Sequence, residues 1–387
     1  MPDSPLFPAW PPQWPEIAES VAESIASGNW GRYQGPAAVE LADQLCQLTA
    51  SKRCRLTSSG SVAVELALRS VGVLPGDQVI CCGYDYPGNF RAIELLGARP
   101  LLVDADPAGF SIDPGQLDEV SDSRVRAVLV SHLYGIPAQI ASIRSLCDRR
   151  GWKLVEDACQ VPGMWVDGRP AAAWGDVGVY SFGGSKPLTA GTGGALLTND
   201  DSVASKWNVL LDRPSNAMPL SELQAAALLP QLLRLEQCNQ IRHETTQFLL
   251  NAVDWLRDAV GDLQPVCGAT CYKLAANVNA APGSVPAGVP GSVPAGAPGS
   301  VPGRDHAGAP GSVPGRDHLL AMLVARGLPV GAGYRSMHRS SDRRCGKVGQ
   351  LGRCRILGEQ LCLFDHSMLL ATGEQRERLA AALKLPQ

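Results

Sequence analysis

A chain of 387 residues is long enough to form one large domain and a smaller one. Its net charge of −3 and aromatic content of 5% give no reason to expect nucleic acid or an anionic membrane as a partner. No stretch reaches the apolar length of a membrane span, and residues 1–16 lack the basic leader and apolar core of a secretion signal. We therefore expect a cytoplasmic protein whose first residues form a proline-stiffened arm.

Twelve cysteines raise the question of a metal site or disulfide framework. Cys267 and Cys271 form the one close pair with a spacer, and no second such pair or His-x-x-x-His accompanies it. We therefore expect scattered buried thiols and no metal.

From residue 53, short apolar runs alternate with amphipathic helical periods, after two helices expected at 17–29 and 36–50. The runs predict strands at 77–83, 99–106, 125–135, 153–158, 176–182 and 194–200, and the helices lie at 62–72, 90–97 and 140–151. Such alternation predicts an α/β fold with a mainly parallel sheet covered on both faces. Ligands of such sheets bind at the carboxyl ends of the strands.

The character of the sequence changes after residue 200. Helical periods dominate 221–258, and a strand at 271–279 and helices at 317–327 and 373–384 suggest a smaller α+β domain. We predict an arm and helix at 1–35, a large domain at 36–240 and a small domain at 241–387. Repeats of PGSVP and GRDH mark 281–314 as a low-complexity surface insertion.

Three features at predicted strand ends carry chemistry. The Ser-rich turn 57–61 precedes a helix, where backbone N–H groups and the helix dipole suit an anion, although most such turns are only helix caps. Glu156 and Asp157 end a strand, so one of them could cap structure or face a ligand. Lys186 sits among small residues with no other charge between Asp176 and Asp200, a setting that favours lost solvation, a lowered pKa and a Schiff-base amine.

An anion turn, a carboxylate and an amine are what pyridoxal phosphate (PLP) requires. Its phosphate needs N–H donors, its pyridinium nitrogen an Asp, and its aldehyde a lysine. The combination therefore predicts a PLP site built on Lys186 and Asp157.

The ordered motifs SSGS, LPGDQVI, SHLYG, VEDACQ, GDVGVYSF and SK…GTGGALLTND resemble the DegT/StrS family of PLP-dependent aminotransferases, known for amino-sugar biosynthesis. The resemblance runs from about Gly28 to Asp200, with a weaker continuation beyond. It implies an aminotransferase of fold type I, with a large PLP-binding domain and a smaller C-terminal one. It also implies a homodimer, glutamate or glutamine as amino donor, and a nucleotide-linked keto-sugar as acceptor.

Carried over by position, the resemblance assigns the cofactor contacts. Lys186 forms the imine with PLP and moves the proton, and Asp157 pairs with the ring nitrogen. The remaining assigned contacts are Gln160 at the ring hydroxyl, Tyr86 on the ring face, and Gly60, Ser61 and Ser181 at the phosphate, with Asn216 standing in for a phosphate ligand from the partner subunit.

Three departures from the family pattern concern the substrate more than the cofactor. Pro187 replaces the usual Asn, the segment 213–222 lacks the usual Asn-Tyr-Arg run, and YDYPGNFR (84–91) differs from the usual Leu-Thr-Phe loop. Two alternatives remain open: an aminotransferase/dehydratase-type enzyme that makes a non-sugar amino compound, and a non-catalytic PLP-binding regulator. Members of the family that dehydrate sugars carry His in place of the lysine, so Lys186 argues against that branch. The arginine-rich stretch 333–347 could face a nucleotide diphosphate or simply be solvated.

Overall fold

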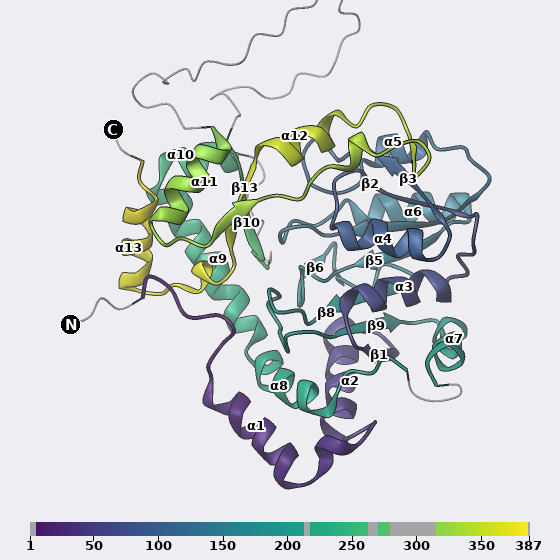
Figure 1. Cartoon of the computed structure of the whole chain (residues 1–387), viewed down its shortest axis with the longest axis horizontal. Coiled ribbons are helices and arrows are strands. Elements are labelled where there is room, and N and C mark those ends of the chain that lie inside the picture. Colours follow the sequence, from purple (N-terminus) through teal and green to yellow (C-terminus); the bar gives the residue numbers. More distant parts are fainter. Residues whose placement is uncertain (1–4, 213–216, 262–269, 279–314, 386–387) are drawn as a thin grey trace, which may run out of the picture.

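The computed structural model describes residues 5–212, 217–261, 270–278 and 315–385. Its centre is an eight-stranded sheet in the order β1-β9-β8-β5-β4-β2-β3-β12, which occupies one half of the molecule, while a smaller three-stranded sheet with its own helices occupies the other (Figure 1). The α/β fold with a mainly parallel sheet is confirmed.

The large sheet is built from short, mostly buried strands. Its members are β1 (Arg53–Thr57), β2 (Gln78–Cys82), β3 (Arg99–Val103), β4 (Val125–Ser131), β5 (Lys153–Asp157), β8 (Val177–Ser181), β9 (Gly194–Thr198) and β12 (Gly346–Lys347). Strand β9 runs antiparallel to both neighbours, and β8, β5, β4, β2, β3 and β12 pair in parallel. Since β1 and β8 therefore point the same way, the carboxyl ends of every strand except β9 lie at one edge.

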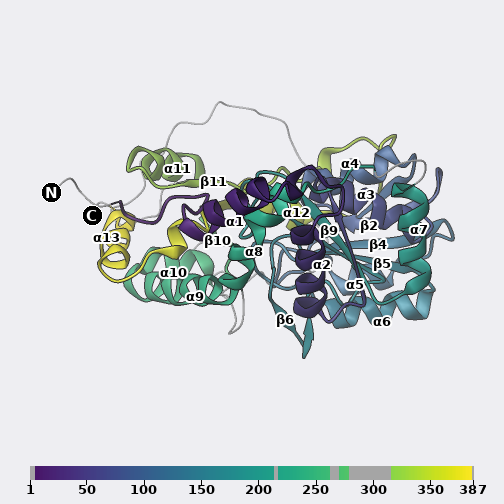
Figure 2. The same ribbon diagram turned by 90° about the horizontal axis from the view of Figure 1, so that it is seen from below.

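Helices cover both faces of this sheet, as the alternating pattern predicts. Helices α3 (Gly60–Ser70) and α4 (Pro87–Leu95) lie on one side of the strands, and α5 (Pro114–Asp118) and α6 (Ile140–Arg150) on the other (Figure 2). Helix α7 (Asp201–Leu211) packs on α3, β1 and β9. A two-stranded ribbon of β6 (Trp165–Val166) and β7 (Arg169–Pro170) follows β5. None of the described helices is long and apolar enough to cross a membrane.

The smaller sheet has the order β10-β13-β11 and is antiparallel throughout. Its strands are β10 (Lys273–Asn277), β11 (Val330–Ala332) and β13 (Leu361–Asp365), and its helices are α9 (Leu235–Ala252), α10 (Asp254–Val260), α11 (Arg316–Ala325), α12 (Gly352–Gln360) and α13 (Glu374–Leu383). The chain returns to the large sheet once, because β12 pairs with β3. The domain boundaries proposed from the sequence stay predictions, and the insertion 281–314 lies outside the described residues.

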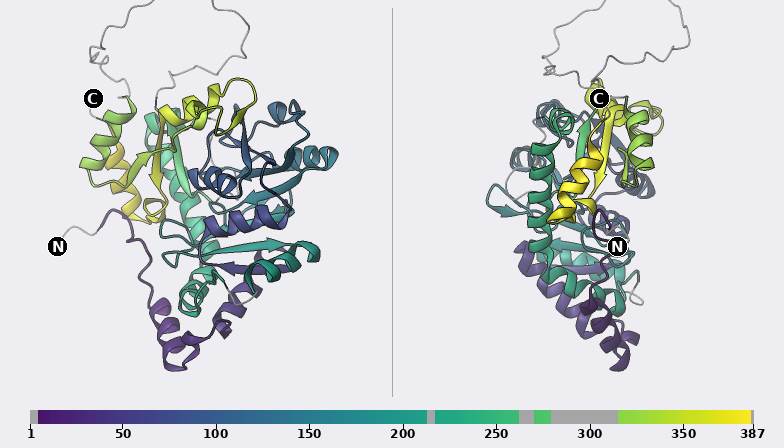
Figure 3. Two further views of the ribbon diagram at one scale, coloured as in Figure 1. Left: turned by 45° about the vertical axis from the view of Figure 1, so that its right-hand side comes forward. Right: turned by 90° about the vertical axis from the view of Figure 1, so that its left-hand side faces the viewer.

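The first described residues form an extended arm that passes from α13 to α1 (Pro15–Ala26), which packs on α8 (Glu222–Leu233) (Figure 3). Gln375 Nε2 donates to the carbonyl of Pro5 (3.1 Å), and Trp10 Nε1 donates to that of Gly184 (3.2 Å). Helix α2 (Pro36–Thr49) follows and packs on both α8 and β1. The arm thus reaches the loop that carries Lys186.

Candidate active site

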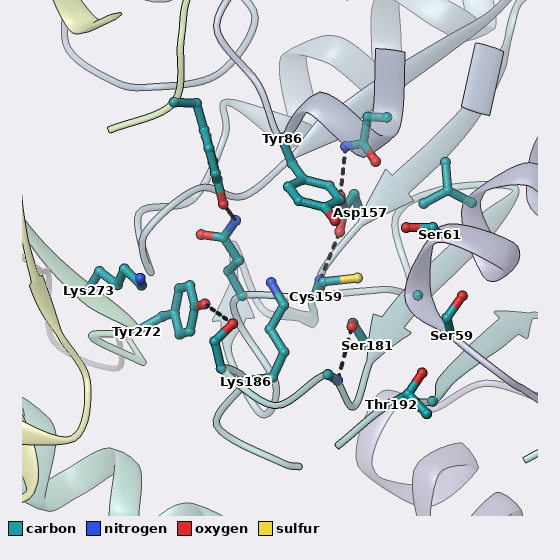
Figure 4. Close-up of a pocket in the computed structure, with 18 residues that line it drawn as sticks. Ser59, Ser61, Tyr86, Asp157, Cys159, Ser181, Lys186, Thr192, Tyr272 and Lys273 are labelled. Carbon is teal, nitrogen blue, oxygen red and sulfur yellow. Dashed lines mark hydrogen bonds between the residues drawn. The ribbon is translucent and has the colours of Figure 1, made fainter. Parts of the chain in front are cut away.

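A cavity of about 360 Å³ lies at the edge of the large sheet where the parallel strands end (Figure 4). Strands β1, β8, β5 and β2 deliver side chains to it in the order in which they lie across the sheet. The lining residues are Ser59, Gly60, Ser61, Val64, Tyr86, Asn89, Asp157, Cys159, Gln160, Ser181, Gly183, Ser185, Lys186, Thr192, Gly193, Tyr272, Lys273 and Tyr334.

One end of the cavity is an anion cradle, by which we mean Ser59, Gly60, Ser61, Ser181 and Thr192. Ser59 is the N-cap of α3, and its Oγ accepts from the N–H of Val62 (3.1 Å). The helix therefore begins at Gly60, two residues earlier than the sequence predicts, and its first turn presents N–H groups that lack intrahelical partners. This end suits a phosphate group.

Gly60 is required at its position because α3 begins against β8. A Cβ at residue 60 would lie 2.6 Å from the Cβ of Ser181. The missing side chain lets the helix start approach the strand end closely, so that the cradle residues line one side of the cavity.

Glu156 and Asp157 are neighbours at the end of β5, and they point to opposite sides of the sheet. Glu156 is fully buried, accepts from the backbone N–H groups of Ala172, Trp174 and Gly175, and contacts His132 Nε2 (3.0 Å). It is the structural member of the pair, and Asp157 lines the cavity.

The Asp157 carboxylate is held by three donors. Its Oδ1 accepts from the N–H of Cys159 (3.0 Å), and its Oδ2 accepts from Asn89 Nδ2 (2.8 Å) and Ser131 Oγ (3.4 Å). These bonds fix its orientation and still leave it lining the cavity, where it can meet a cationic ring nitrogen.

Lys186 lies in the loop between β8 and β9, and its side chain points into the cavity from the side opposite Tyr86 (Figure 4). Its Nζ is 5.0 Å from the ring centre of Tyr272 and 6.0 Å from that of Tyr86. The side chain expected to carry the cofactor therefore shares one cavity with Asp157 and the anion cradle.

The lowered pKa expected for Lys186 is wrong for the protein without cofactor. Burial, the largest single effect, lowers the pKa, but the negative charges that Tyr272, Cys159, Asp157 and Tyr86 can carry together outweigh it, so the pKa of Lys186 is raised. The sequence showed the absence of neighbouring charges along the loop, but it did not show which acidic side chains other strands bring to it.

Gln160 and Tyr86 complete the set expected from the sequence. Gln160 accepts at Oε1 from the N–H of Tyr134 (2.7 Å), and its Nε2 donates to the hydroxyl of Tyr334 (3.3 Å). Tyr86 precedes α4 and contacts Tyr334 edge-on at 5.9 Å between ring centres. The described site residues of the prediction thus converge, whereas Asn216 lies outside the described residues.

The end of the cavity away from the cradle was not predicted. It is formed by Tyr272 and Lys273 at the start of β10 and by Tyr334 after β11. The strand-like run 271–279 was visible in the sequence, but nothing in it shows that the smaller sheet turns its first residues toward Lys186. Lys273 Nζ also lies 3.5 Å from Asp365 Oδ2.

Two other sequence features lie mostly away from the cavity, to which the arginine-rich stretch 333–347 contributes Tyr334 and the cysteines contribute Cys159. In the arginine-rich stretch, Arg344 pairs with Glu94 (2.7 Å), and Lys347 lies 3.5 Å from Asp342. The described cysteines are dispersed through the fold, and most of them are buried. Cys267 lies outside the described residues.

The family model described as the DegT/DnrJ/EryC1/StrS aminotransferase family matches residues 13–262. The chain belongs to this family. The resemblance inferred from the sequence motifs is therefore confirmed.

Several curated members of the DegT/DnrJ/EryC1/StrS family are about one third identical to the chain. The L-glutamine:2-deoxy-scyllo-inosose aminotransferase of Streptoalloteichus tenebrarius is 32% identical over 63% of this chain and 64% of its own length. The L-glutamine:scyllo-inosose aminotransferase of Streptomyces griseus is 32% identical over 68% and 67%, respectively. The UDP-2-acetamido-2-deoxy-3-oxo-D-glucuronate aminotransferase of Pseudomonas aeruginosa is 34% identical over 52% and 60%. The chain thus spans 60 to 67% of the length of these relatives.

Solved structures share the fold over nearly the whole chain. An aminotransferase from Psychrobacter cryohalolentis has a TM-score of 0.81 at 19% identity and covers 97% of this chain and 98% of its own. The 3-amino-5-hydroxybenzoic acid synthase has a TM-score of 0.79 at 21% identity and covers 98% of each. A GDP-4-keto-6-deoxy-D-mannose-3-dehydratase of E. coli, solved with bound hydrated PLP, has a TM-score of 0.77 at 16% identity and covers 98% of this chain and 99% of its own.

Proposed function

We propose that this protein is a PLP-dependent aminotransferase that transfers an amino group from glutamate or glutamine to a keto-sugar. The observation that carries the proposal is the convergence of Lys186, Asp157 and the anion cradle on one cavity. These three are an amine, a carboxylate and a set of N–H and hydroxyl donors, which together match the aldehyde, the ring nitrogen and the phosphate of PLP.

The residues present fit the cofactor at each of its polar groups. Lys186 would hold the aldehyde, Asp157 the protonated ring nitrogen, Gln160 the ring hydroxyl, and Gly60, Ser61 and Ser181 the phosphate, with Tyr86 on the ring face. When bound, PLP supplies an electron sink that stabilises the negative charge left after a substrate C–H proton is removed.

This chain's own residues then do three things. The anion cradle would orient the cofactor, because N–H groups at the start of a helix bind phosphate from a fixed direction. Asp157 favours a protonated ring nitrogen through its negative charge. Lys186 Nζ, once the substrate amine has displaced it, takes up and returns the substrate proton as the acid and base of both half-reactions.

The substrates are proposed from the relatives and from the cavity. The relatives named above include glutamine-dependent inosose aminotransferases and an aminotransferase of a UDP-linked oxo-sugar. Tyr272, Lys273 and Tyr334 line the end of the cavity away from the cradle, where one cation and two tyrosine hydroxyls suit an acidic donor and a polyhydroxylated acceptor. We further propose that the acceptor is nucleotide-linked, like the sugar in the name of the relative from Pseudomonas aeruginosa.

The test begins with the visible absorbance of the purified protein mixed with PLP. We expect a band from lysine-bound cofactor, and borohydride reduction should fix the cofactor on the peptide that contains Lys186. A label on Lys153 or Lys206 would overturn the assignment of Lys186. Lys153 pairs with Asp176 (2.9 Å) and Lys206 donates to the carbonyl of Ser70 (2.7 Å), so both serve as internal controls.

The reaction is tested by adding each substrate in turn. Glutamate or glutamine should bleach the band and release its keto acid in an amount equal to the sites, and a keto-sugar should restore it. If no amino donor bleaches the band, the aminotransferase proposal fails and a dehydratase or non-catalytic regulator takes its place. If donors bleach it and every keto-sugar fails, the acceptor is a non-sugar ketone.

We also propose a homodimer, and the cytoplasmic location stays a prediction from the sequence. The support for the dimer is a group of exposed apolar side chains where the chain enters α2, namely Trp30, Tyr33 and Val39.

A further inference from the structure

A second carboxylate lies buried beside Asp157. Asp85 follows β2 in the segment 84–91, which departs from the family pattern, and it is 1% exposed. Its Oδ1 accepts from the N–H of Tyr86 (2.6 Å), and its Oδ2 contacts Ser131 Oγ (3.0 Å). Ser131 Oγ in turn contacts Asp157 Oδ2 at 3.4 Å. One hydroxyl therefore bridges the two carboxyl groups.

Asn89 ties the same groups together from α4. Its Nδ2 lies 2.8 Å from Asp157 Oδ2, 2.9 Å from Ser131 Oγ and 3.3 Å from Asp85 Oδ1. The amide orientation is set by this network, because the opposite orientation would place its carbonyl oxygen against two carboxyl groups. Asp85, Asn89, Ser131 and Asp157 form a cluster that we call the carboxyl relay.

The carboxyl relay holds two acidic groups without a basic side chain among its four members. Two buried carboxylates repel each other, and a single proton shared between them removes most of this unfavourable energy. Burial and, after it, the charge of Asp157 raise the pKa of Asp85 to about 7. A proton on Asp85 Oδ2 can be donated to Ser131 Oγ, whose own hydroxyl hydrogen then points to Asp157 Oδ2.

The titratable groups that face Asp85 from neighbouring elements do not take over the role of the proton on Asp85. Cys81 on β2 and Tyr334 after β11 both have a pKa raised by burial and, further, by the charge of Asp85, so they are neutral near pH 7. Lys186 faces Asp157 from the opposite wall of the cavity, and its pKa is raised with Asp157 among the causes. The carboxyl relay is therefore the acidic side of the site and Lys186 the basic side.

We propose that Asp85 is a positioning residue for Asp157, acting through Ser131 and Asn89. In its protonated form it turns the Ser131 hydroxyl onto Asp157, and when ionised it places a second negative charge behind the group that meets the cofactor ring nitrogen. The inference rests on the proposed function, since it assigns Asp85 to the control of the same cofactor.

The test is a pH titration of the absorbance band of the PLP-loaded protein, full length, for wild type, Asp85→Asn and Asp104→Asn. Asp104 is the matched control: it is a partly buried carboxylate after the neighbouring β3, and it accepts from the N–H groups of Arg353 (2.9 Å) and Cys354 (2.7 Å). An ionised Asp85 favours the protonated form of the lysine-bound cofactor. Asp85→Asn should therefore lower the midpoint of the titration by about half a pH unit or more, whereas Asp104→Asn should leave it in place.

Ser131→Ala provides a second, independent variant. The hydrogen bond from Ser131 lowers the pKa of Asp85. Without this bond Asp85 should ionise at higher pH, and the effect of its charge on the absorbance titration should appear at higher pH. Curves of Asp85→Asn and Ser131→Ala that superimpose on wild type, or a raised midpoint in Asp85→Asn, would overturn the inference. If Asp85→Asn does not fold, a Ser131→Ala curve without the shift to higher pH expected for the ionisation of Asp85 overturns the inference. A wild-type protein that forms no band with PLP fails the proposed function instead, so the two failures are distinguishable.

Discussion

Glu156 and Asp157 serve unrelated purposes although they are adjacent, because successive side chains of a strand point to opposite faces. Glu156 satisfies the backbone of residues 172–175, and Asp157 meets the cavity. The same rule applies at the end of β4, where Ser131 is the register partner of Asp157. The end of β5 thus contributes one side chain to the cavity and one to the surrounding structure.

The raised pKa of Lys186 gives a prediction about cofactor loading. Only the neutral amine attacks an aldehyde, and below the pKa the neutral fraction rises roughly tenfold for each pH unit. The rate at which the absorbance band grows after PLP is added should therefore climb steadily between pH 6.5 and 8.5, measured relative to Nα-acetyl-lysine as a control for the titration of PLP itself. A rate that is already flat across this range would mean that Lys186 has a lowered pKa.

The residues of the site differ in how far the sequence revealed them. Lys186, Asp157 and the Ser-Gly turn could be found because each follows an apolar strand and has a distinctive local composition. Asp85 could not be found, because its role depends on β2 lying beside β4 in the sheet, next to Ser131. Lys273 and Tyr334 come from the smaller sheet, whose orientation no local pattern encodes.

At the scale of elements, the predicted strands of the large sheet and the helices between them were found because burial on both faces leaves continuous apolar runs. The two strands of the large sheet that the sequence did not predict are β1 and β12. Strand β1 is an edge strand with two arginines, Arg53 and Arg55, that pair with Asp201 and Asp212. Strand β12 has two residues, Gly346 and Lys347, and exists only through its pairing with β3. Such elements are defined by tertiary contacts and have no periodicity of their own.

The start of α3 gives a prediction at this scale. Gly60→Ala places a Cβ 2.6 Å from that of Ser181, which would push the helix start away from β8. We expect a loss of about 1–3 kcal/mol in the free energy of unfolding and weaker PLP binding, because the anion cradle widens. Gly315→Ala is the control, since a Cβ there meets nothing within 4 Å. Urea denaturation and PLP titration measure the two effects, and a Gly60→Ala protein that matches Gly315→Ala in both would show that the close approach is not needed.

At the scale of the whole molecule, the site is assembled from segments far apart in the chain. The arm places Trp10 edge-on to the ring of His366 (4.4 Å between centres) and donates to Gly184, two residues before Lys186. The ring of His366 stacks on Tyr272 (5.6 Å), which lines the cavity. The arm, the smaller sheet and the loop that carries Lys186 therefore pack against one another at the edge of the large sheet where the cavity lies.

The remaining surface points to a second subunit. Trp30, Tyr33 and Val39 are 56%, 77% and 53% exposed where the chain enters α2, and large apolar side chains at such exposure favour burial against a partner. A cavity of about 220 Å³ beside them is lined by Tyr33, Val39 and Leu220. Leu220 also packs under Gly193, which lines the active site, so burial of this patch would bear on the cofactor end of the site.

We therefore expect a homodimer that depends on this patch. Sedimentation velocity at micromolar concentration should give a dimer for wild type, and Val39→Glu should shift it toward monomer, because a carboxylate would then be buried without a partner. The same variant should bind PLP more weakly, because Val39 and Leu220 line one cavity and Leu220 packs under Gly193. Leu74→Glu is the matched control: Leu74 is 62% exposed in the loop before β2, at the edge of the sheet opposite the site, and its variant should remain dimeric with normal PLP affinity. A wild-type monomer that binds PLP as tightly as any variant would contradict both the dimer and its link to the site.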